Sequence, residues 1–213
     1  MTPGAYAAPD AAAPTVEALA RALELHDYRR GEFGETSAHT ERVTRLALAL
    51  TERVAAELLL DPQLAFGFRL HDIGMIGIPS STLIKPGPLS PTEVDEIREH
   101  PWLGERIVAP VTALSGVARE VIACHHERWD GSGYPRGLRG HEIPLPARIF
   151  AIVDAFDAIT HDQPYRNALG VDAARDEIHA KAGSHFDPEL AQVFLTLDEV
   201  IEPAELEFPL EQP

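Results

Sequence analysis

The stretch ARIFAIVDAFDAIT, residues 147–160, decides the fold class that we expect for this chain. It is strongly apolar and long enough for a buried helix, yet it places a carboxylate, Asp154, between Val153 and Phe156. An ionised carboxylate in such surroundings costs several kcal/mol unless it is paired or binds a cation. Asp154 is therefore expected either to pair with an arginine such as Arg148 or to bind a metal ion.

Helical signals recur on both sides of this stretch. Residues 40–60, TERVTRLALALTERVAAELLL, repeat apolar residues at helical spacing. Residues 90–93, Ser-Pro-Thr-Glu, have the pattern of a capped helix start, and residues 187–188, Asp-Pro, open a last helix that runs to about residue 201. No segment shows the period-2 alternation of a strand. The sequence therefore predicts an all-α fold.

The chain is expected to form one domain over residues 15–202. Residues 1–14 are mostly Ala, Pro and Gly with little to bury, so they predict a disordered leader, and residues 203–213 predict a flexible tail. Between them, residues 129–146 hold four glycines and three prolines, which is typical of a loop.

Composition narrows the class of protein. The 213 residues carry a net charge of −16, which argues against DNA or an anionic membrane as a partner, since both need clustered Lys and Arg. A single cysteine excludes an intrachain disulfide and fits a reducing compartment. No apolar run reaches the roughly 18 residues of a membrane helix. We therefore expect a cytoplasmic protein.

Residues 71–74, HDIG, place an imidazole beside a carboxylate. On a helix the two side chains would point about 100° apart. His71 could then bind one metal ion while Asp72 bridges to a second. Taken alone the dipeptide is common, and a surface pair near a helix end is the alternative.

Further histidines and carboxylates add weight to the metal interpretation. Glu35 and His39 share one face if their segment is helical, although an exposed helix-stabilising pair has the same spacing. His125 and His126 end an apolar stretch, where one solvated and one packed histidine is the alternative.

His100 precedes Pro101, which disfavours helical geometry at His100 and predicts that a helix ends or bends there. A capping or surface role for His100 is the alternative. Taken together, the five histidines and three carboxylates suit a site for two or three metal ions, and mixed ligands of this kind favour iron, manganese or zinc. Such a site can activate water and polarise a phosphoryl oxygen.

Five motifs together resemble the HD-GYP family: HDIGMIGIP, KPGPLS, HHERWDGSGYP, LPARIFAIVDAFDAIT and DQPYR. This family is the branch of the HD phosphohydrolase superfamily that degrades cyclic di-GMP in bacteria. The resemblance spans about residues 15–200. It implies an HD-domain helical bundle with an iron or manganese centre in its core and a Gly/Pro-rich GYP loop beside it.

The resemblance also implies site residues, position by position. Asp72 and His71 take the catalytic role, and Glu35 matches a position that implies a third metal ion. Asp157 has no ligand role in the family, so we expect it to be structural. The implied metal ligands are Glu35, His39, His71, Asp72, His100, His125, His126 and Asp154.

The GYP element, residues 133–135, is expected to shape the substrate pocket. By resemblance, Tyr134 offers a hydroxyl to a phosphate and a ring to a guanine, and Pro135 stiffens the turn. Trp129 and Asp130 are expected to brace the loop. The same surface resembles one that contacts diguanylate cyclase domains in relatives.

Two expected phosphate contacts depart from the family pattern. Met75 stands where the family usually has Lys, and Gln163 stands where it usually has Arg, so that Arg166 alone remains of this group. Losing a charged hydrogen bond to a phosphate costs about 1.5–3 kcal/mol. Lys85 and Arg136 are candidate substitutes.

These observations favour a metal-dependent phosphodiesterase in which a metal-activated hydroxide cuts cyclic di-GMP to pGpG, or to GMP after a second cut. Two alternatives stay open. One is a metal-containing module that binds a cyclic dinucleotide or a partner protein with little turnover, which Met75 and Gln163 favour. The other is a phosphohydrolase of another nucleotide. By analogy with related domains, two chains are expected to pair as a homodimer.

Overall fold

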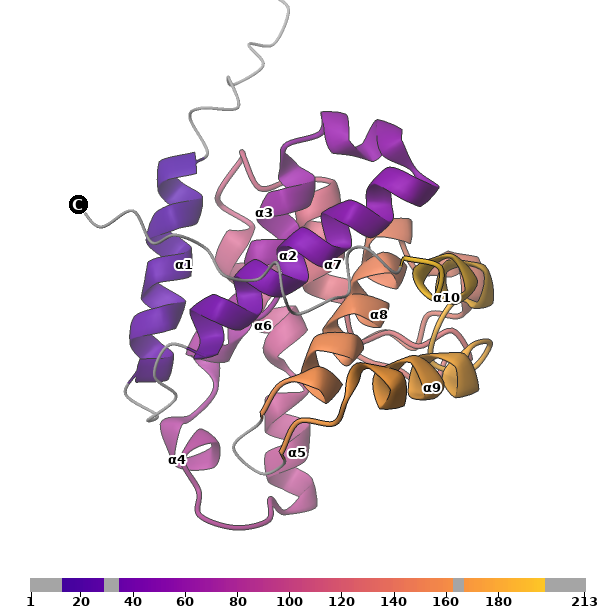
Figure 1. Ribbon diagram of the computed structural model, residues 1–213. Coiled ribbons are helices and arrows are strands. Elements are labelled where there is room, and N and C mark those ends of the chain that lie inside the picture. Colours follow the sequence, from indigo (N-terminus) through magenta and orange to yellow (C-terminus); the bar gives the residue numbers. More distant parts are fainter. Residues whose placement is uncertain (1–12, 29–34, 163–166, 198–213) are drawn as a thin grey trace, which may run out of the picture.

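The computed structural model describes residues 13–28, 35–162 and 167–197, and these form a helical fold (Figure 1). Their β structure is limited to an isolated bridge between Ala182 and Phe186, so the predicted all-α class is confirmed. The α-helices are α1 Ala13–Tyr28, α2 Glu35–Val54, α3 Gln63–Arg69, α4 Ser80–Leu83, α5 Pro91–Ile97, α6 His100–Val108, α7 Val117–Cys124, α8 Leu145–Thr160, α9 Val171–Lys181 and α10 Pro188–Phe194. Short 3₁₀ helices are η2 Ala56–Leu60, η3 Ile73–Gly77 and η4 Gly140–Glu142.

Helix α8 lies at the centre of the larger hydrophobic core. Ile149, Phe150, Ile152 and Val153 are fully buried along it, which explains the long apolar run in the sequence. The helices α2, α9 and α10 pack around α8, and Figure 1 shows α2 alongside it. Because α8 is enclosed in this way, a carboxylate on it needs a partner or must reach an opening.

A second core lies between α1 and the segment from α3 to α7. Val16 and Leu23 of α1 meet Leu70, Ile73 and Ile122, all of them buried. Helices α3 and α7 pack against each other, and they contribute residues to both cores. The turn after α3 and the end of α7 are therefore fixed relative to each other.

A close approach between η3 and α6 depends on glycine. A Cβ atom at Gly74 would lie 1.9 Å from the carbonyl oxygen of His100 and 2.6 Å from the amide nitrogen of Gly104. Any larger residue at position 74 would push α6 away. This contact holds His100 beside the HDIG turn.

Several local expectations hold, and a few boundaries differ. Ser90 caps α5 in a capping box with Glu93, and Asp187 caps α10, as the sequence predicts. The break before Pro101 is also present, but His100 is the first residue of α6 instead of the end of a helix.

Three further differences concern helix limits. HDIG does not lie on an α-helix, because His71 and Asp72 form the turn after α3 while Ile73 and Gly74 begin η3. Helix α10 ends at Phe194, short of the predicted end, and residues 198–213 lie outside the described part of the chain. At the other end, α1 begins at Ala13, two residues inside the predicted leader, whose residues 1–12 are likewise outside it.

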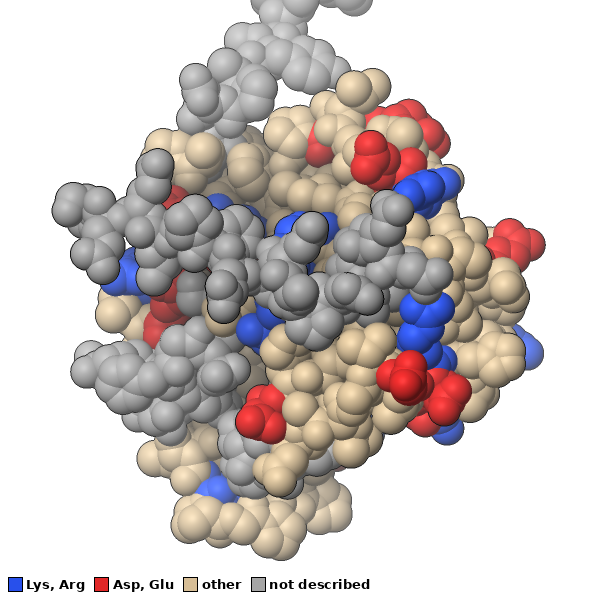
Figure 2. Space-filling view, viewed as in Figure 1, with Lys and Arg blue, Asp and Glu red and all other residues tan. Residues whose placement is uncertain are grey.

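Charge is distributed in small groups on the surface. Figure 2 shows acidic and basic side chains interspersed over the described part of one face, where the basic ones form no extended stripe. Within the described ranges, no helix is both long enough and apolar enough to cross a membrane.

Candidate metal centre

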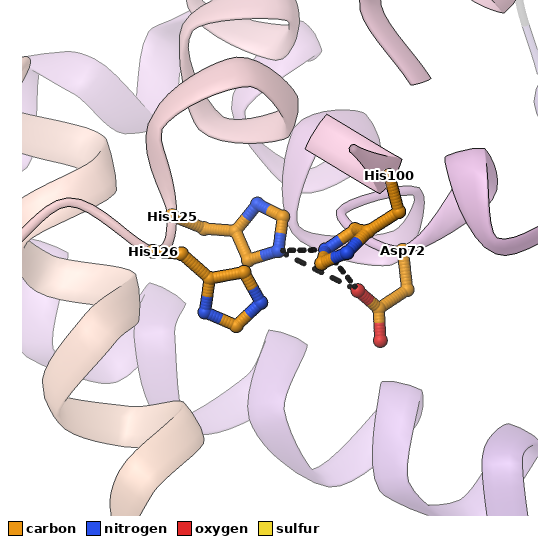
Figure 3. Close-up of side chains that lie close together, drawn as sticks. All are labelled: Asp72, His100, His125 and His126. Carbon is orange, nitrogen blue, oxygen red and sulfur yellow. Dashed lines mark hydrogen bonds and ion pairs between the residues drawn. The ribbon is translucent and has the colours of Figure 1, made fainter. Parts of the chain in front are cut away.

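Four side chains from three segments converge in what we call the first ligand group: Asp72, His100, His125 and His126. Asp72 comes from the turn after α3, His100 begins α6, and the two adjacent histidines follow α7. Each offers one ligand atom, and these atoms all lie within 4.8 Å of one another. Figure 3 shows Asp72 and His100 facing His125, with His126 alongside. The predicted residues are thus brought together across more than 50 positions of sequence.

Backbone carbonyls fix the orientation of the buried imidazoles. His100 Nδ1 lies 2.8 Å from the carbonyl oxygen of Ile97, and His125 Nδ1 lies 3.1 Å from that of Ile122. His71 Nδ1 lies 2.9 Å from the carbonyl oxygen of Phe68. In a neutral ring whose Nδ1 donates its hydrogen, Nε2 carries a lone pair. Each of these histidines therefore turns an Nε2 lone pair towards the site.

The lone pairs meet at short range. His100 Nε2 and His125 Nε2 are 3.1 Å apart, and Asp72 Oδ1 lies 3.1 Å from the first and 3.5 Å from the second. Two lone pairs and a carboxylate oxygen at these distances repel one another unless a cation or a proton lies among them. The residues of the first ligand group therefore fit a divalent metal ion, and a backbone carbonyl on Nδ1 is a usual partner of a metal-binding histidine.

A second ligand group lies next to the first and consists of His39, His71 and Asp154. His39 comes from α2 and Asp154 from α8, and His39 Nε2 is 3.5 Å from Asp154 Oδ1. Asp72 joins the two groups, since its Oδ2 lies 3.3 Å from His71 Nε2 while its Oδ1 faces His100. Two oxygens of one carboxylate thus point to two groups, which is the geometry that a bridge between two metal ions requires.

Asp154 does not form the arginine pair that the sequence left open. Arg148 instead binds Asp187, with 2.6 Å between Nη1 and Oδ2. That alternative is wrong, because α8 turns Arg148 towards α10 and Asp154 towards α2.

Asp157 has a role that the sequence did not reveal. It is fully buried, its Oδ2 lies 2.7 Å from His39 Nδ1, and Arg42 Nε donates to its Oδ1 at 2.6 Å. His161 Nδ1 lies 3.1 Å from the same Oδ1. Asp157 is structural, as expected, but the structure that it supports is the orientation of His39. The weak signal was its place one helical turn after Asp154.

The pKa values fit these contacts. Burial, then the neighbouring histidine, lowers the pKa of His126 well below its ordinary value, and burial lowers the pKa of His125. Both rings are therefore neutral at neutral pH, the state that binds metal. Burial is the largest single influence on the pKa of His71 and acts to lower it, but the charge and hydrogen bond of Asp72, the charge of Asp154 and the Phe68 carbonyl together raise that pKa to about 9. A metal ion at His71 must displace this proton.

The carboxyl of Asp72 is the negative member of the same pair. Burial acts to raise its pKa, but the charge of His71 and the close imidazoles of His100 and His125 together outweigh that effect. Its pKa is held well below the ordinary value, so Asp72 is ionised at neutral pH and available to cations.

The GYP loop covers the first ligand group. The ring of Tyr134 stacks on that of His126, with 4.8 Å between centroids and 26° between planes. A Cβ at Gly133 would lie 2.3 Å from the amide nitrogen of Arg128, so the loop needs glycine to fold back on its own backbone. Pro135 follows Tyr134 in a cis peptide bond.

Hydrogen bonds to the backbone of this loop hold it in place. Trp129 N and Asp130 N donate to the carbonyl oxygens of His185 and Ser184, as expected of bracing residues. Glu127, which the sequence gave no reason to select, is buried and accepts hydrogen bonds from the backbone nitrogens of Arg136 and Leu138 at 2.7 Å and 3.0 Å. These contacts fix Tyr134 over His126.

The remaining site predictions have mixed outcomes. Met75 is partly buried against the second core. The two candidate substitute cations are already paired, since Lys85 Nζ lies 2.6 Å from Glu93 and Arg136 Nη2 lies 3.0 Å from Glu105. Three predicted site residues fall outside the part of the chain that the structure describes. They are Gln163, Arg166 and the side chain of Glu35, whose backbone begins α2.

Comparison with known proteins agrees with the fold and shows the family. A profile of the HD domain family matches residues 19–190, and the chain belongs to this family, as its resemblance to the HD-GYP branch implied. The HDG"Y"P protein Bd1817 from Bdellovibrio bacteriovorus has a similar structure, with a TM-score of 0.59 and 20% identity over 74% of this chain and 50% of that one.

Curated relatives are more similar in sequence. The chain is 40% identical to a cyclic di-GMP phosphodiesterase of Thermotoga maritima over 171 residues, which cover 78% of this chain and 46% of the relative. It is 37% identical to a 3'3'-cGAMP-specific phosphodiesterase 2 of Vibrio cholerae over 162 residues, or 76% of this chain and 31% of the relative. The chain thus spans less than half the length of these relatives.

Proposed function

We propose that this chain is a metal-dependent phosphodiesterase that hydrolyses cyclic di-GMP to pGpG, or to GMP after a second cut. The observation that carries the proposal is the pair of ligand groups joined by Asp72, whose two oxygens face His71 on one side and His100 on the other. Similarity to phosphodiesterases of two cyclic dinucleotides supports the same reaction class.

The proposed metal ligands are those that the resemblance implies, with Glu35 reserved for a third ion. Mixed imidazole and carboxylate ligands favour iron or manganese over calcium or magnesium. Bound ions would lower the pKa of a water molecule and neutralise the charge that develops on the phosphate.

The protein's own residues would position the substrate and select it. The carbonyl-bound histidines keep their lone pairs aimed at the site without reorganisation, which is how electrostatic catalysis is prepared in advance. Tyr134 remains a phenol at neutral pH because burial raises its pKa, so its hydroxyl can donate to a phosphate oxygen. Pro135 and the bracing contacts hold its ring in place for a base to stack on.

Met75 carries the case for a second candidate, a module that binds a cyclic dinucleotide with little turnover. A methionine cannot donate a hydrogen bond to phosphate, and its partial burial in the second core gives it a packing role. We propose Gln163 and Arg166 as further substrate contacts. Another cyclic dinucleotide, 3'3'-cGAMP, is the natural alternative substrate because of the second relative.

Hydrolysis of cyclic di-GMP by anaerobically purified protein reconstituted with Mn²⁺ or Fe²⁺ tests the proposal, with metal counted on the same sample. Product at two or more metal ions per chain supports the phosphodiesterase. Full occupancy without product from either cyclic dinucleotide contradicts it and favours the binding module, for which Met75→Lys with Gln163→Arg is the next variant.

Three wider expectations belong to the same proposal. They are a cytoplasmic location, contact with a diguanylate cyclase domain through the GYP loop, and pairing of two chains. Size-exclusion chromatography with light scattering tests the last, and a chain that stays monomeric at high concentration would contradict it.

A further inference from the structure

Arg98 lies beside the metal centre but belongs to neither ligand group. It follows α5 and comes two residues before His100, and its guanidinium carbon is 5.5 Å from the centre of the Tyr134 ring. The same ring stacks on His126 of the first ligand group. An exposed cation is thus one aromatic ring away from the proposed reaction centre.

This arginine is only lightly held. Its ion pair with Asp95 spans 3.7 Å, and the two side chains are 55% and 73% exposed. An exposed pair of this kind contributes little, so the guanidinium N–H groups stay available to a ligand. Lys85 and Arg136, by contrast, are held at 2.6 Å and 3.0 Å by their carboxylates. Arg128, also near the loop, contacts His185 at 3.3 Å.

A cyclic dinucleotide presents two phosphodiester groups, and the ring of the molecule keeps them apart. When one lies at the metal ligands, the other keeps its negative charge some distance away, over a protein whose net charge is −16. We propose that Arg98 binds this second phosphodiester and so selects cyclic dinucleotides over substrates with a single phosphodiester. This inference rests on the proposed function.

The physical basis is the guanidinium fork. Its planar N–H groups bind two oxygens of one phosphate, which makes the contact both stronger and more directional than that of an ammonium. Its approach to Tyr134 keeps it near the loop before substrate arrives, because a cation over an aromatic face is weakly attracted. Arg98 is therefore a specificity residue, separate from the metal chemistry.

The test compares two substrates on the metal-loaded protein. Cyclic di-GMP has two phosphodiesters, and bis(p-nitrophenyl) phosphate has one. Arg98→Ala should raise KM for cyclic di-GMP at least about 10-fold, the effect of losing a hydrogen bond to a charged group. Turnover of bis(p-nitrophenyl) phosphate should stay within about 2-fold, since that substrate has no second phosphodiester. Arg98→Lys should recover part of the loss because it keeps the charge.

Arg106 supplies a matched control. Its guanidinium carbon lies 4.7 Å over the ring of Trp102, the same kind of exposed contact elsewhere on the surface. Arg106→Ala should change neither substrate's kinetics. Thermal unfolding of each variant shows that the fold is kept.

Every other result of this comparison either supports or overturns the role of Arg98. Equal losses on both substrates would mean that Arg98 supports the loop or the metal centre, and an unchanged KM for cyclic di-GMP would overturn the inference directly. If the unmodified protein cleaves only bis(p-nitrophenyl) phosphate, the proposed function fails while the inference is judged by calorimetric binding of cyclic di-GMP. Weaker binding by Arg98→Ala then supports it, and equal or absent binding overturns it.

Discussion

The two ligand groups are held in different ways. In the first, His100 and His125 are almost wholly buried, with side chains 3% and 0% exposed, and backbone carbonyls orient them. In the second, His39 and Asp154 are 23% and 27% exposed, and His39 is oriented by the side chain of Asp157. Main-chain carbonyls therefore orient the buried histidines of both groups, including His71 of the second, whereas His39 depends on a side-chain network.

This difference decides which substitutions can disturb each ligand group without removing a ligand. A carbonyl cannot be removed by substitution, so the hydrogen bonds that orient His100 and His125 cannot be deleted by changing a side chain. The second group depends on Asp157, which can be changed without touching a ligand. The first group should therefore hold metal more tightly and tolerate more sequence change around it.

The largest effect should come from Asp72, which faces both groups. Asp72→Ala removes the bridge and should lower activity by more than about 100-fold, because losses of outer contacts alone cost 10–100-fold at metal sites. Phosphodiesterase activity and metal content are measured together. Asp176→Ala, which removes an exposed carboxylate on α9, is the control. For Asp72→Ala, activity within tenfold of the unmodified protein would contradict a bridging role.

Asp157 and Asp187 offer a matched pair for the next effect. Both are buried aspartates that bind an arginine at 2.6 Å, but only Asp157 touches a proposed ligand. Asp157→Asn should weaken metal binding at the second group about 10–100-fold. Asp187→Asn should lower the free energy of unfolding by up to about 3 kcal/mol and leave metal content unchanged.

Metal titrations and chemical denaturation of both variants check this prediction. Equal metal loss in the two variants would show that Asp157 acts through general stability and not through His39.

Partial removal of metal should distinguish the groups directly. With increasing chelator, the second group, whose His39 and Asp154 are partly exposed, should lose its ion first, and the melting temperature should fall in two steps. An ion present at 100 times its dissociation constant stabilises the fold by about 2.7 kcal/mol, so each step is measurable. Loss of both ions in a single step would remove the distinction between the groups.

The smallest effect is expected away from both groups. Ser90 caps α5 and accepts a hydrogen bond from Glu93 N, so Ser90→Ala should cost about 1 kcal/mol of stability. Metal content should not change. Metal released by so small a loss would mean that the centre depends on global stability, contrary to the local account given above.

Sequence reasoning predicted the fold class from local signals, and it named, with the help of the family resemblance, candidate ligands that the structure brings together. Helical spacing and the caps at Ser90 and Asp187 depend on residues a few positions apart. The candidate ligands were found because imidazoles and carboxylates in apolar stretches need an explanation. Their roles stay predictions until metal is located.

The missed residues depend on long-range contacts. Asp157 meets His39 across 118 positions, and nothing near it in sequence names that partner. Arg148 binds Asp187 across 39 positions, and nothing near it in sequence indicates that partner, so the alternative pair of Arg148 with Asp154 was wrong. Nothing in the sequence singles out Arg98, which becomes a candidate only because its guanidinium lies over the Tyr134 ring in the structure.

The most direct test of the central claim is anomalous diffraction from crystals of the Mn²⁺-reconstituted protein. The account predicts one peak among Asp72, His100, His125 and His126, and a second among His39, His71 and Asp154, with Asp72 between them. Manganese at neither group, or a single ion that leaves His100 and His125 unligated, would contradict it.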